Sequence, residues 1–441
     1  MPCFLPKKKS YRNYQKKFHY VCLLFQKALY LRKSNFIIKY VIMENIFDLT
    51  TEQLREIANN LQAKIEEGLK KDGMEISDIP THISPKQDIS NGKVLTLDWG
   101  GTNFRAAVVE FKNGKPFIIE TKKKPLSAVE TAGFKQDDLF NEMASLICEL
   151  ESLDESVTQI GYCFSYPAQC ELNGDAVLIE WTKGIEIMDM VKKPVGEPLM
   201  RYLNACKNIR PTFNKIKVIN DTVACLFAGL SETGYDTYLG LIVGTGTNMA
   251  SLMPLEKIEK LNSKEAGAIP VNLESGNFRP PHLTVVDGLV DAMSNNKGYQ
   301  LFEKAISGGY MGEVFKTVFL NRKIKYNFDG ADLANLLNNP AGQPEDQVHA
   351  AQWIYDRSAK LVAASLAGLA QVVVAQHDSI KKICLAADGS VFWGKNQNNV
   401  TYYKNLVAKE LETLLPEGVT ITVIDEMQDP NLVGSAISAL S

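Results

Sequence analysis

The stretch LDWGGTNFRAAVV, residues 97–109, is the part of the sequence that decides the fold. Two runs that read as β-strands flank a short segment containing two glycines, a threonine, an asparagine and an arginine. Glycine lets the backbone approach an anion closely, and the Thr hydroxyl, Asn amide and Arg guanidinium add donors for phosphate oxygens. The stretch therefore predicts a strand–turn–strand unit whose turn can hold a phosphate group.

A second strand–turn–strand unit follows later in the chain. The apolar strand 238–243 leads into the turn GTGTN, residues 244–248, and a strand returns over 249–253. A third apolar strand, 383–387, ends at Asp388-Gly389-Ser390. One glycine-rich hairpin is common in proteins that bind no ligand, whereas three related turns favour phosphate binding. None of these turns has the spacing of a P-loop or a Rossmann fingerprint. Two similar hairpins that face a nucleotide indicate a cleft between two α/β domains.

Local patterns predict the elements around these turns. Thr50 and Gln53 form a capping-box pattern before an amphipathic stretch, and Asn113-Gly114 is typical of a type I′ hairpin turn. The helices expected are 50–72, 136–152, 223–229 and 356–376, the last of them buried. The strands expected in the first half are 94–98, 104–111, 116–122, 158–165 and 215–221.

The composition limits the class of protein. In a chain of 441 residues, 45% hydrophobic and 22% charged residues are ordinary for a soluble globular protein with two domains or one large one. The net charge of −3 argues against a general nucleic-acid binder. Eight cysteines without a C-x-x-C pair indicate reduced thiols, and five histidines without an H-E-x-x-H motif argue against a zinc site.

The first 42 residues differ from the rest in charge. They hold ten of the 48 Lys and Arg residues and no Asp or Glu, so the other 38 face 51 acidic residues and the rest of the chain carries −13. Three interpretations fit: an organelle-targeting arm, a membrane-surface segment, or an extension upstream of a translation start at Met43. We favour the extension, because a balanced helix-forming sequence begins there and the arm lacks a secretory cleavage site. Its longest apolar run, Tyr20–Phe25, is far too short to span a bilayer.

Polar residues lie at the ends of several apolar strands and in nearby loops. They are Ser165, Thr182, Lys183, Asn220, Asp221, Asn248, Glu274 and Glu303. Each alone is explained as a surface residue, but together their hydroxyl, amide, carboxylate and ammonium groups can hydrogen-bond a polyhydroxylated ligand from several sides. Asp221, at the end of an expected strand, is a candidate base; it can also, or instead, cap the following helix. Asp98, beside the first turn, can hold a hydrated Mg²⁺.

Together these motifs resemble those of the hexokinases, the family that includes glucokinases and the yeast hexokinases. The resemblance runs from about Phe47 to Ser441. LDWGGTNFR and GLIVGTGTN resemble its phosphate motifs, FSYPAQ and WTKG its sugar motif, and VINDTVACL the segment with its catalytic Asp. VNLESGNF and KGYQLFEKAISGGYMGE resemble its sugar-binding carboxylate segments, and AADGSVF its adenosine motif.

The resemblance implies an α/β fold of the two-domain actin-like ATPase (ribonuclease H-like) kind, with a cleft between a small and a large domain. The implied parts are a basic extension 1–42, a helical segment 43–90 on the large domain, a small domain 91–219, a large domain 220–430, and a C-terminal helix 431–441 returning to the small domain. The implied reaction is ATP-dependent phosphorylation of a hexose, glucose first, at its 6-hydroxyl, as the first step of glycolysis in the cytoplasm. It implies no nucleic-acid partner and no membrane span, and leaves monomer and homodimer open.

The resemblance also implies a role for each matched residue. Asp221 would be the general base, with ATP and Mg²⁺ as cofactors, and Asp98 would reach the metal through water without holding it directly. Sugar hydroxyls would be bound by Ser165, Thr182, Lys183, Asn220, Asn248, Glu274 and Glu303. ATP would be bound by Asp98, Gly100, Gly101, Thr102, Asn103, Arg105, Gly244, Thr245, Gly246, Gly389 and Ser390, the last two beside the adenosine.

The sequence departs from the family at a few positions. Trp99 replaces the usual Leu or Ile behind the first phosphate turn, Ala387 replaces Val, and SGNF follows Glu274 where W-G-A-F is usual. A loop carrying Arg279-Pro280-Pro281 near the sugar is also expected to differ. These departures bear on the range of sugars and leave phosphoryl transfer as the expected chemistry. The rival readings are an ATPase of the same architecture, which would hydrolyse ATP without sugar, and a non-catalytic sugar sensor.

Overall fold

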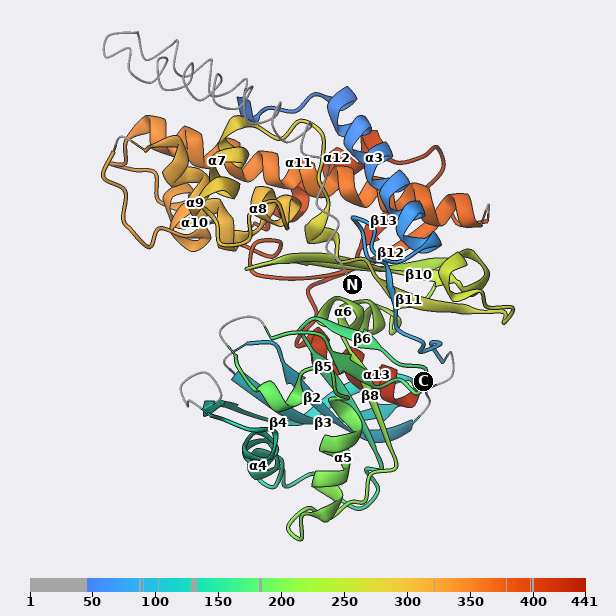
Figure 1. The fold of residues 1–441 in the computed structure, drawn as a ribbon. Helices are drawn as coiled ribbons and strands as arrows, with labels where there is room; N and C mark the ends of the chain where they lie inside the picture. Colours follow the sequence, from blue (N-terminus) through green and yellow to red (C-terminus); the bar gives the residue numbers. More distant parts are fainter. Residues whose placement is uncertain are drawn as a thin grey trace, which may run out of the picture.

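The computed structural model describes residues 46–86, 89, 91–101, 103–127, 133–181, 185–320, 322–377, 379–396, 398 and 400–441. The expectations for the basic extension 1–42, and for Thr102, Thr182 and Lys183, fall outside these residues. The described chain forms two main β-sheets, one above the other in Figure 1, with helices outside and between them. This α/β architecture positions every site discussed below.

The lower sheet in Figure 1 has five strands in the order β4-β3-β2-β5-β8. Its strands are β2 (Asn91–Trp99), β3 (Asn103–Lys112), β4 (Lys115–Pro125), β5 (Gln159–Phe164) and β8 (Lys215–Ile219). β2, β3 and β4 form an antiparallel meander, and β5 and β8 add in parallel. Asn113 and Gly114 have φ of 50° and 81°, which confirms the predicted left-handed hairpin turn.

The upper sheet has six strands in the order β1-β11-β10-β9-β12-β13. Its strands are β1 (Ile79–Pro80), β9 (Thr237–Val243), β10 (Thr247–Pro254), β11 (Ala268–Asn272), β12 (Lys382–Asp388) and β13 (Thr420–Val423). β9 and β10 form the second predicted hairpin, while β12 and β13 add in parallel. The five neighbouring strands β11-β10-β9-β12-β13 repeat the order and directions of the five-stranded sheet. This confirms the repeat seen in the sequence. A short hairpin of β6 (Ala168–Cys170) and β7 (Ala176–Leu178) stands apart.

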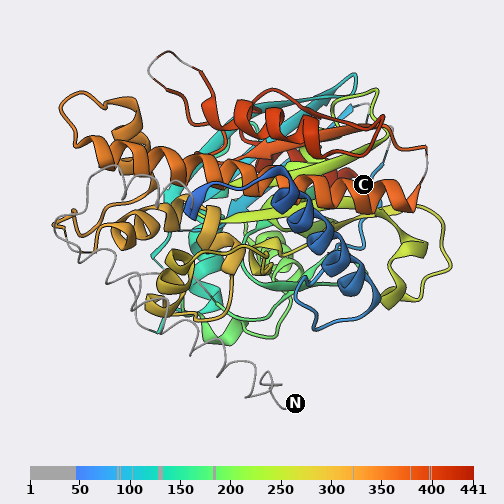
Figure 2. The same ribbon diagram turned by 90° about the horizontal axis from the view of Figure 1, so that it is seen from above.

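The helices form three layers around the two sheets. Their bounds are α3 (Thr51–Lys70), α4 (Gln136–Ile147), α5 (Gly196–Ala205), α6 (Asp221–Gly229), α7 (Val285–Met293), α8 (Leu301–Ile306), α9 (Gly308–Val318), α10 (Gly330–Asn338), α11 (Glu345–Gln376), α12 (Tyr402–Leu414) and α13 (Pro430–Leu440). Helices α3, α11 and α12 pack together over the six-stranded sheet, as the view from above in Figure 2 also shows. Helices α4 and α5 lie outside the five-stranded sheet.

Helices α6 and α13 occupy the space between the sheets. Helix α6 contacts β9, β10, β11 and β12 of the upper sheet and β5 of the lower one, while α13 packs on α6 and on β2, β5 and β8. Their close packing depends on glycine, because a Cβ at Gly434 of α13 would lie 1.8 Å from the carbonyl oxygen of Ala224 in α6. This helix pair therefore joins the two halves of the molecule.

Several elements differ from the expected bounds for local reasons. The capping box of Thr50 and Gln53 is present at α3 as predicted. Helix α4 ends five residues early, where hydrogen bonds tighten to i→i+3 after Ile147. Helix α11 begins at Glu345, directly after Pro344, and is longer than expected. Among the described residues α11 alone has the length and hydropathy to cross a membrane, but most of that stretch is buried within the protein, as in a core helix.

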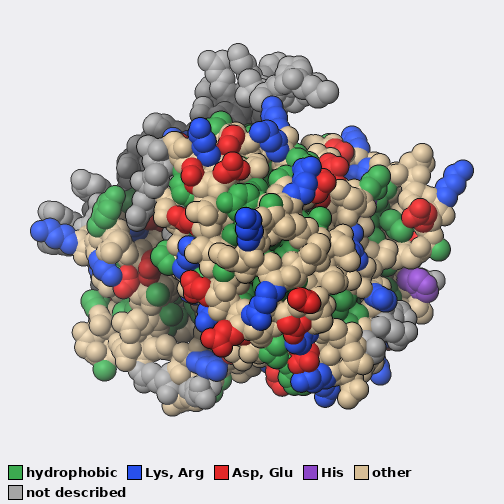
Figure 3. Space-filling view, turned by 90° about the horizontal axis from the view of Figure 1, so that it is seen from below, with side chains coloured by type: hydrophobic (Ala, Val, Ile, Leu, Met, Phe, Trp, Pro, Cys, Tyr) green, Lys and Arg blue, Asp and Glu red, His purple; other side chains and the backbone are tan. Residues whose placement is uncertain are grey.

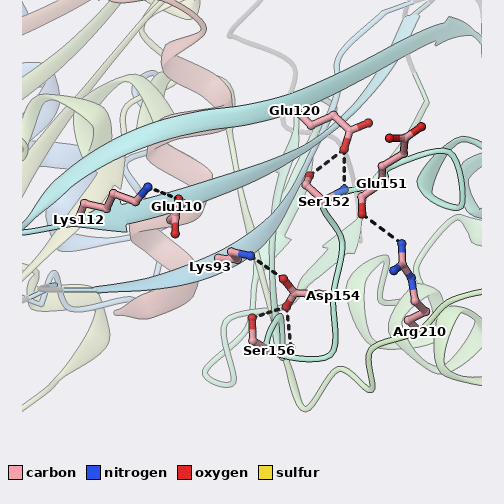
Figure 4. A network of polar contacts seen from close by, with 9 residues as sticks. All are labelled: Lys93, Glu110, Lys112, Glu120, Glu151, Ser152, Asp154, Ser156 and Arg210. Atoms are coloured by element: carbon pink, nitrogen blue, oxygen red, sulfur yellow. Dashed lines mark hydrogen bonds and ion pairs between the residues drawn. The ribbon is translucent and has the colours of Figure 1, made fainter.

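Polar contacts fasten the surface loops of the five-stranded sheet (Figure 4). Ser152 donates to Glu120 of β4 from its backbone N–H and its hydroxyl, each at 2.8 Å, and Arg210 donates to the Glu151 carbonyl at 3.1 Å. The Lys93 ammonium and the Ser156 donors lower the pKa of Asp154. Figure 3 views this end of the molecule, where basic and acidic side chains intermingle.

A buried carboxyl lies behind the upper sheet. Asp78, just before β1, is fully buried at a left-handed φ of 44°, and neither carboxyl oxygen has a hydrogen-bond partner. A Cβ at Gly68 of α3 would lie 2.2 Å from its Oδ2, so the helix packs directly on this group. Burial raises the pKa of Asp78 well above its ordinary value, although the charge of Lys260 opposes the shift.

Candidate active site

The first predicted phosphate turn lies at the end of β2, beside an ion-pair cluster. Asp98 pairs across the hairpin with Arg105, whose Nε donates to the Asp98 carboxylate at 2.8 Å. The Arg105 guanidinium also binds Asp429, the residue that precedes α13. Arg105 therefore already balances two carboxylates, so its expected role as a phosphate donor needs a rearrangement or a shared contact.

Aromatic side chains hold the turn on one side, and its other side is open. The Gly101 carbonyl accepts a hydrogen bond from the Trp99 indole at 2.9 Å and from the Tyr166 hydroxyl at 3.4 Å. Trp99 is fully buried among Phe164, Tyr166 and Trp181, which explains where the unusual Trp fits. A Cβ at Gly101 would meet no atom within 4 Å, so a ligand can approach the backbone there.

The second and third turns pack against each other and form one wall. Gly389 has a φ of +114°, and a Cβ there would lie 2.3 Å from the Val243 carbonyl oxygen and 2.7 Å from the Gly244 nitrogen. The first N–H groups of α9, at Gly308 and Gly309, donate to the carbonyls of Gly244 and Thr245 at 2.8 and 3.0 Å. Glycine is thus required at position 389 of the third turn by its positive φ and by the close approach of the second turn's backbone.

A cavity of about 740 Å³ opens beside this wall. Its volume falls within the range of small-ligand pockets. The exposed hydroxyl residues Thr245 and Ser390, both predicted for the nucleotide, lie on its lining. Sequence reasoning missed the rest of that lining, which includes Gly308, Asp329, Gly330, Asn335, Asn338, Lys395, Asn396 and Tyr402. The capping pattern of Asp329 and Asp332, which starts α10 next to the cavity, is the signal that could have located part of it.

Asp221 is the first residue of α6 and does not belong to the strand, which ends at Ile219. This corrects the expected strand 215–221 and the capping alternative, since Asn220 is the N-cap and its side-chain oxygen accepts from the Thr222 N–H at 2.9 Å. The Asp221 carboxylate accepts from the same N–H at 2.8 Å. A helix N-terminus favours a negatively charged carboxylate, which is the form that accepts a proton.

Asn248, Glu274 and Glu303 come together around the β9–β10 hairpin. Glu303 of α8 accepts from the Thr247 N–H at 3.1 Å, and a Cβ at Gly246 would lie 2.7 Å from the same carboxylate. Asn248 is joined to Glu274 through Asn272, at the end of β11, by two hydrogen bonds of 2.7 Å. Asn272 was not among the expected site residues, because the strand AIPVN reads as apolar and short.

The lower half contributes a second part of this site. Asn220, Asn272 and Glu274 line a small pocket between the two halves together with Phe164 and Tyr166 of the lower one. Ser165 begins the loop after β5, where its N–H donates to the Trp99 carbonyl at 3.1 Å. Of the described residues expected to bind the sugar, Asn220 and Glu274 line this pocket.

Three carboxylates from different elements share one electrostatic environment. Burial raises the pKa of Asp388, at the end of β12, and the charges of Asp221 and Asp98 raise it further. The buried thiol of Cys163 has its pKa raised by burial and then by Asp98 and Asp221. Among the described residues, no three potential ligands lie close enough together to hold a metal ion.

Comparison with known proteins gives matches along the chain. Two family models, both described as hexokinase, match residues 40–230 and residues 238–342 with 345–441. The glucokinase of Aspergillus niger is 30% identical over 376 residues, which cover 76% of this chain and 74% of that protein. Hexokinase-1 of Saccharomyces cerevisiae is 32% identical over 63% of this chain and 60% of its own length. Against hexokinase-2 of Rattus norvegicus, 31% identical, the matched part spans only 31% of that protein.

Solved structures share the fold. A hexokinase from Schistosoma mansoni complexed with glucose superposes with a TM-score of 0.75 at 22% identity, over 91% of this chain and 98% of that one. A second hexokinase crystal structure gives a TM-score of 0.74 at 26% identity, over 91% of this chain and 99% of that one. The two-sheet architecture with its central helices is therefore that of these proteins.

Proposed function

Because the chain belongs to the hexokinase family and is a hexose 6-phosphotransferase, we propose that it acts on glucose with MgATP and uses Asp221 as its general base. The observation that carries the proposal is the position of Asp221 at the start of α6, the helix that contacts both sheets. We further propose that the reaction is the first step of glycolysis in the cytoplasm.

The nucleotide is assigned to the wall and cavity beside α9 and α10. The triphosphate lies between the two glycine turns, bound by Asp98, Gly100, Gly101, Thr102, Asn103, Arg105, Gly244, Thr245 and Gly246. The adenosine lies in the cavity beside Gly389 and Ser390, where exposed Thr245 and Ser390 hydroxyls support the assignment. A Mg²⁺ ion bound with ATP would supply neutralisation of the phosphate charge, and Asp98 would hold it through water.

The sugar is assigned to the region between the halves around Asp221 and the β9–β10 hairpin. Its hydroxyls are bound by Ser165, Thr182, Lys183, Asn220, Asn248, Glu274 and Glu303. The Asn220 oxygen is used by the helix cap, so its amide N–H₂ is the part that faces the sugar. Glu274 and Glu303 accept hydrogen bonds from hydroxyls, and a sugar that lacks one leaves a buried acceptor unpaired at a cost of about 1–3 kcal/mol.

The chemical step depends mainly on the positioning of the reacting groups. Phosphoryl transfer has a loose transition state, so the protein aligns the hydroxyl with the γ-phosphorus and stabilises the developing charge. Asp221 takes the hydroxyl proton as the bond to phosphorus forms. The N–H of Thr222, which donates to that carboxylate, holds the oxygen in place.

A coupled assay tests the proposal. ADP release is measured with ATP alone and with glucose, mannose, fructose and galactose in turn. We expect release to depend on a hexose and the product to carry its phosphate on the 6-hydroxyl. ADP release at the same rate with and without every sugar would instead identify an ATPase of this architecture, and sugar binding with no ADP release would identify a sensor.

A further inference from the structure

Asn248 has its side chain fixed in one orientation by the backbone. Its Oδ1 accepts from the N–H groups of Met249 at 2.8 Å and Ser275 at 3.1 Å. Since only the amide oxygen can accept, the NH₂ group must point the other way. It does so, and donates to Oδ1 of Asn272 at 2.7 Å.

The orientation of Asn272 follows from that of Asn248. With its oxygen occupied, Asn272 turns its NH₂ group to Glu274 and donates to Oε1 at 2.7 Å. Asn272 is only 5% exposed and lies at the end of β11, where its backbone is paired with Ala250 and Ile79 on either side. The three side chains therefore form a hydrogen-bond chain that runs in one direction, from the backbone to a carboxylate.

The carboxylate at the end of this chain is on a strained residue. Glu274 has φ 57° and ψ 44°, a left-handed conformation that is unfavourable for a side chain of its size. Such a conformation persists where surrounding contacts enforce it, and here Asn272 holds the side chain while the Glu274 carbonyl accepts from Asn277 at 3.1 Å. These contacts therefore fix the orientation of the Glu274 carboxylate.

We propose that Asn272 is a positioning residue for sugar binding, which acts by orienting the Glu274 carboxylate through the chain that begins at Asn248. This rests on the proposed function, because it takes Glu274 as a sugar-binding residue. Asn272 holds Oε1 in place through the hydrogen bond of 2.7 Å that it donates. The carboxylate is thereby held in one orientation toward the sugar hydroxyls.

The test compares two substitutions at Asn272 with a matched control. Asn272→Asp keeps the shape and the acceptor for Asn248 but removes the donor to Glu274, and Asn272→Ala removes both without adding charge. The control is Asn204→Asp, because Asn204 also accepts and donates one hydrogen bond, both with Phe213 at 2.8 Å, outside the site.

We expect both Asn272 variants to raise the KM for glucose by about 10- to 100-fold, equivalent to roughly 1.4–2.8 kcal/mol, with the KM for ATP within about twofold of the parent. A purely structural role would instead lower thermal stability and active fraction without separating the two KM values, as expected for Asn204→Asp. A folded Asn272→Ala variant with an unchanged KM for glucose would overturn the inference.

A double-mutant cycle tests whether Asn272 affects the KM for glucose through Glu274. In a Glu274→Ala background, adding Asn272→Ala should change the KM for glucose by less than about threefold, because the carboxylate it orients is gone. Full additivity of the two substitutions would show that Asn272 does not act through Glu274. If the parent protein shows no hexose-dependent ADP release, the proposed function fails; if it is active and the cycle is additive, only this inference fails.

Discussion

Asp221 is the residue on which catalysis is expected to depend most. Replacing it with Asn keeps the side-chain shape at the first turn of α6 but removes the proton acceptor. We expect kcat to fall by roughly 10²- to 10⁴-fold, the usual contribution of a general base. The unfolding temperature should stay close to that of the parent, and glucose should still bind in calorimetry. Turnover near the parent value in a folded Asp221→Asn variant would remove the residue from this role.

Asp78 makes stability depend on pH in a direction opposite to that of most carboxyls. In the native state burial raises its pKa well above the ordinary value, whereas in the unfolded chain it releases its proton near the ordinary pKa of about 3.9. Above that pH the native state holds one more proton than the unfolded state, so stability falls as pH rises through the interval up to the native pKa.

Replacing Asp78 with Asn removes this contribution, and Asn also tolerates the left-handed φ. We expect the unfolding temperature to rise by about 2 °C or more at pH 7 and to change little near pH 4. Asp72→Asn is the control, because Asp72 is exposed and contacts the same Lys260. A thermal-shift series that gave the same change at both pH values would contradict the account.

Hairpins were predictable from sequence because their determinants are local. Asn113-Gly114 and the GTGTN turn carry their own backbone preferences, and both hairpins have the expected strands. The start of α6 was misplaced, because Lys215–Ile219 and the cap at Asn220 form a continuous run whose end is set by one side-chain hydrogen bond. Asn272 was missed because its two partners are 24 and two positions away and only the paired strands bring all three together.

At the scale of elements, a change that displaces one turn of the nucleotide wall should also disturb the turn packed against it. Gly389→Ala places a Cβ 2.3 Å from the Val243 carbonyl, which forces the third turn away from the second. We expect the KM for ATP to rise by at least about tenfold, as a displacement worth 1.4 kcal/mol would do, with a smaller change in the KM for glucose.

Gly418→Ala is the control, because it introduces backbone strain without the steric clash expected for Gly389→Ala. Gly418 also has a positive φ, of +74°, but a Cβ there would meet no atom within 4 Å. It should lower stability slightly and leave both KM values unchanged. Equal effects of the two substitutions on the KM for ATP would argue against a shared wall.

At the scale of the whole molecule, the repeated strand order places one hairpin turn on each side of the helices that join the halves. Water competes with the sugar for the γ-phosphoryl group, and a cleft that closes only on the sugar limits this loss. We expect glucose to reduce the radius of gyration in solution scattering, whereas galactose, with an inverted hydroxyl, should have a weaker effect. An unchanged radius at saturating glucose would contradict sugar-driven closure. The domain boundaries implied by the resemblance stay a prediction, which limited proteolysis can examine.

The packing of α13 has a consequence for how the protein is made. The helix that covers β2, β5 and β8 comes about 200 residues after the last of these strands. At typical translation speeds that interval lasts roughly 10–40 s, during which a nascent five-stranded sheet leaves the ribosome with one apolar face bare. Cellular chaperones that hold unfinished chains are therefore expected to associate with it until residues 430–440 emerge, and a ribosome stalled before that point should carry a product that aggregates on release.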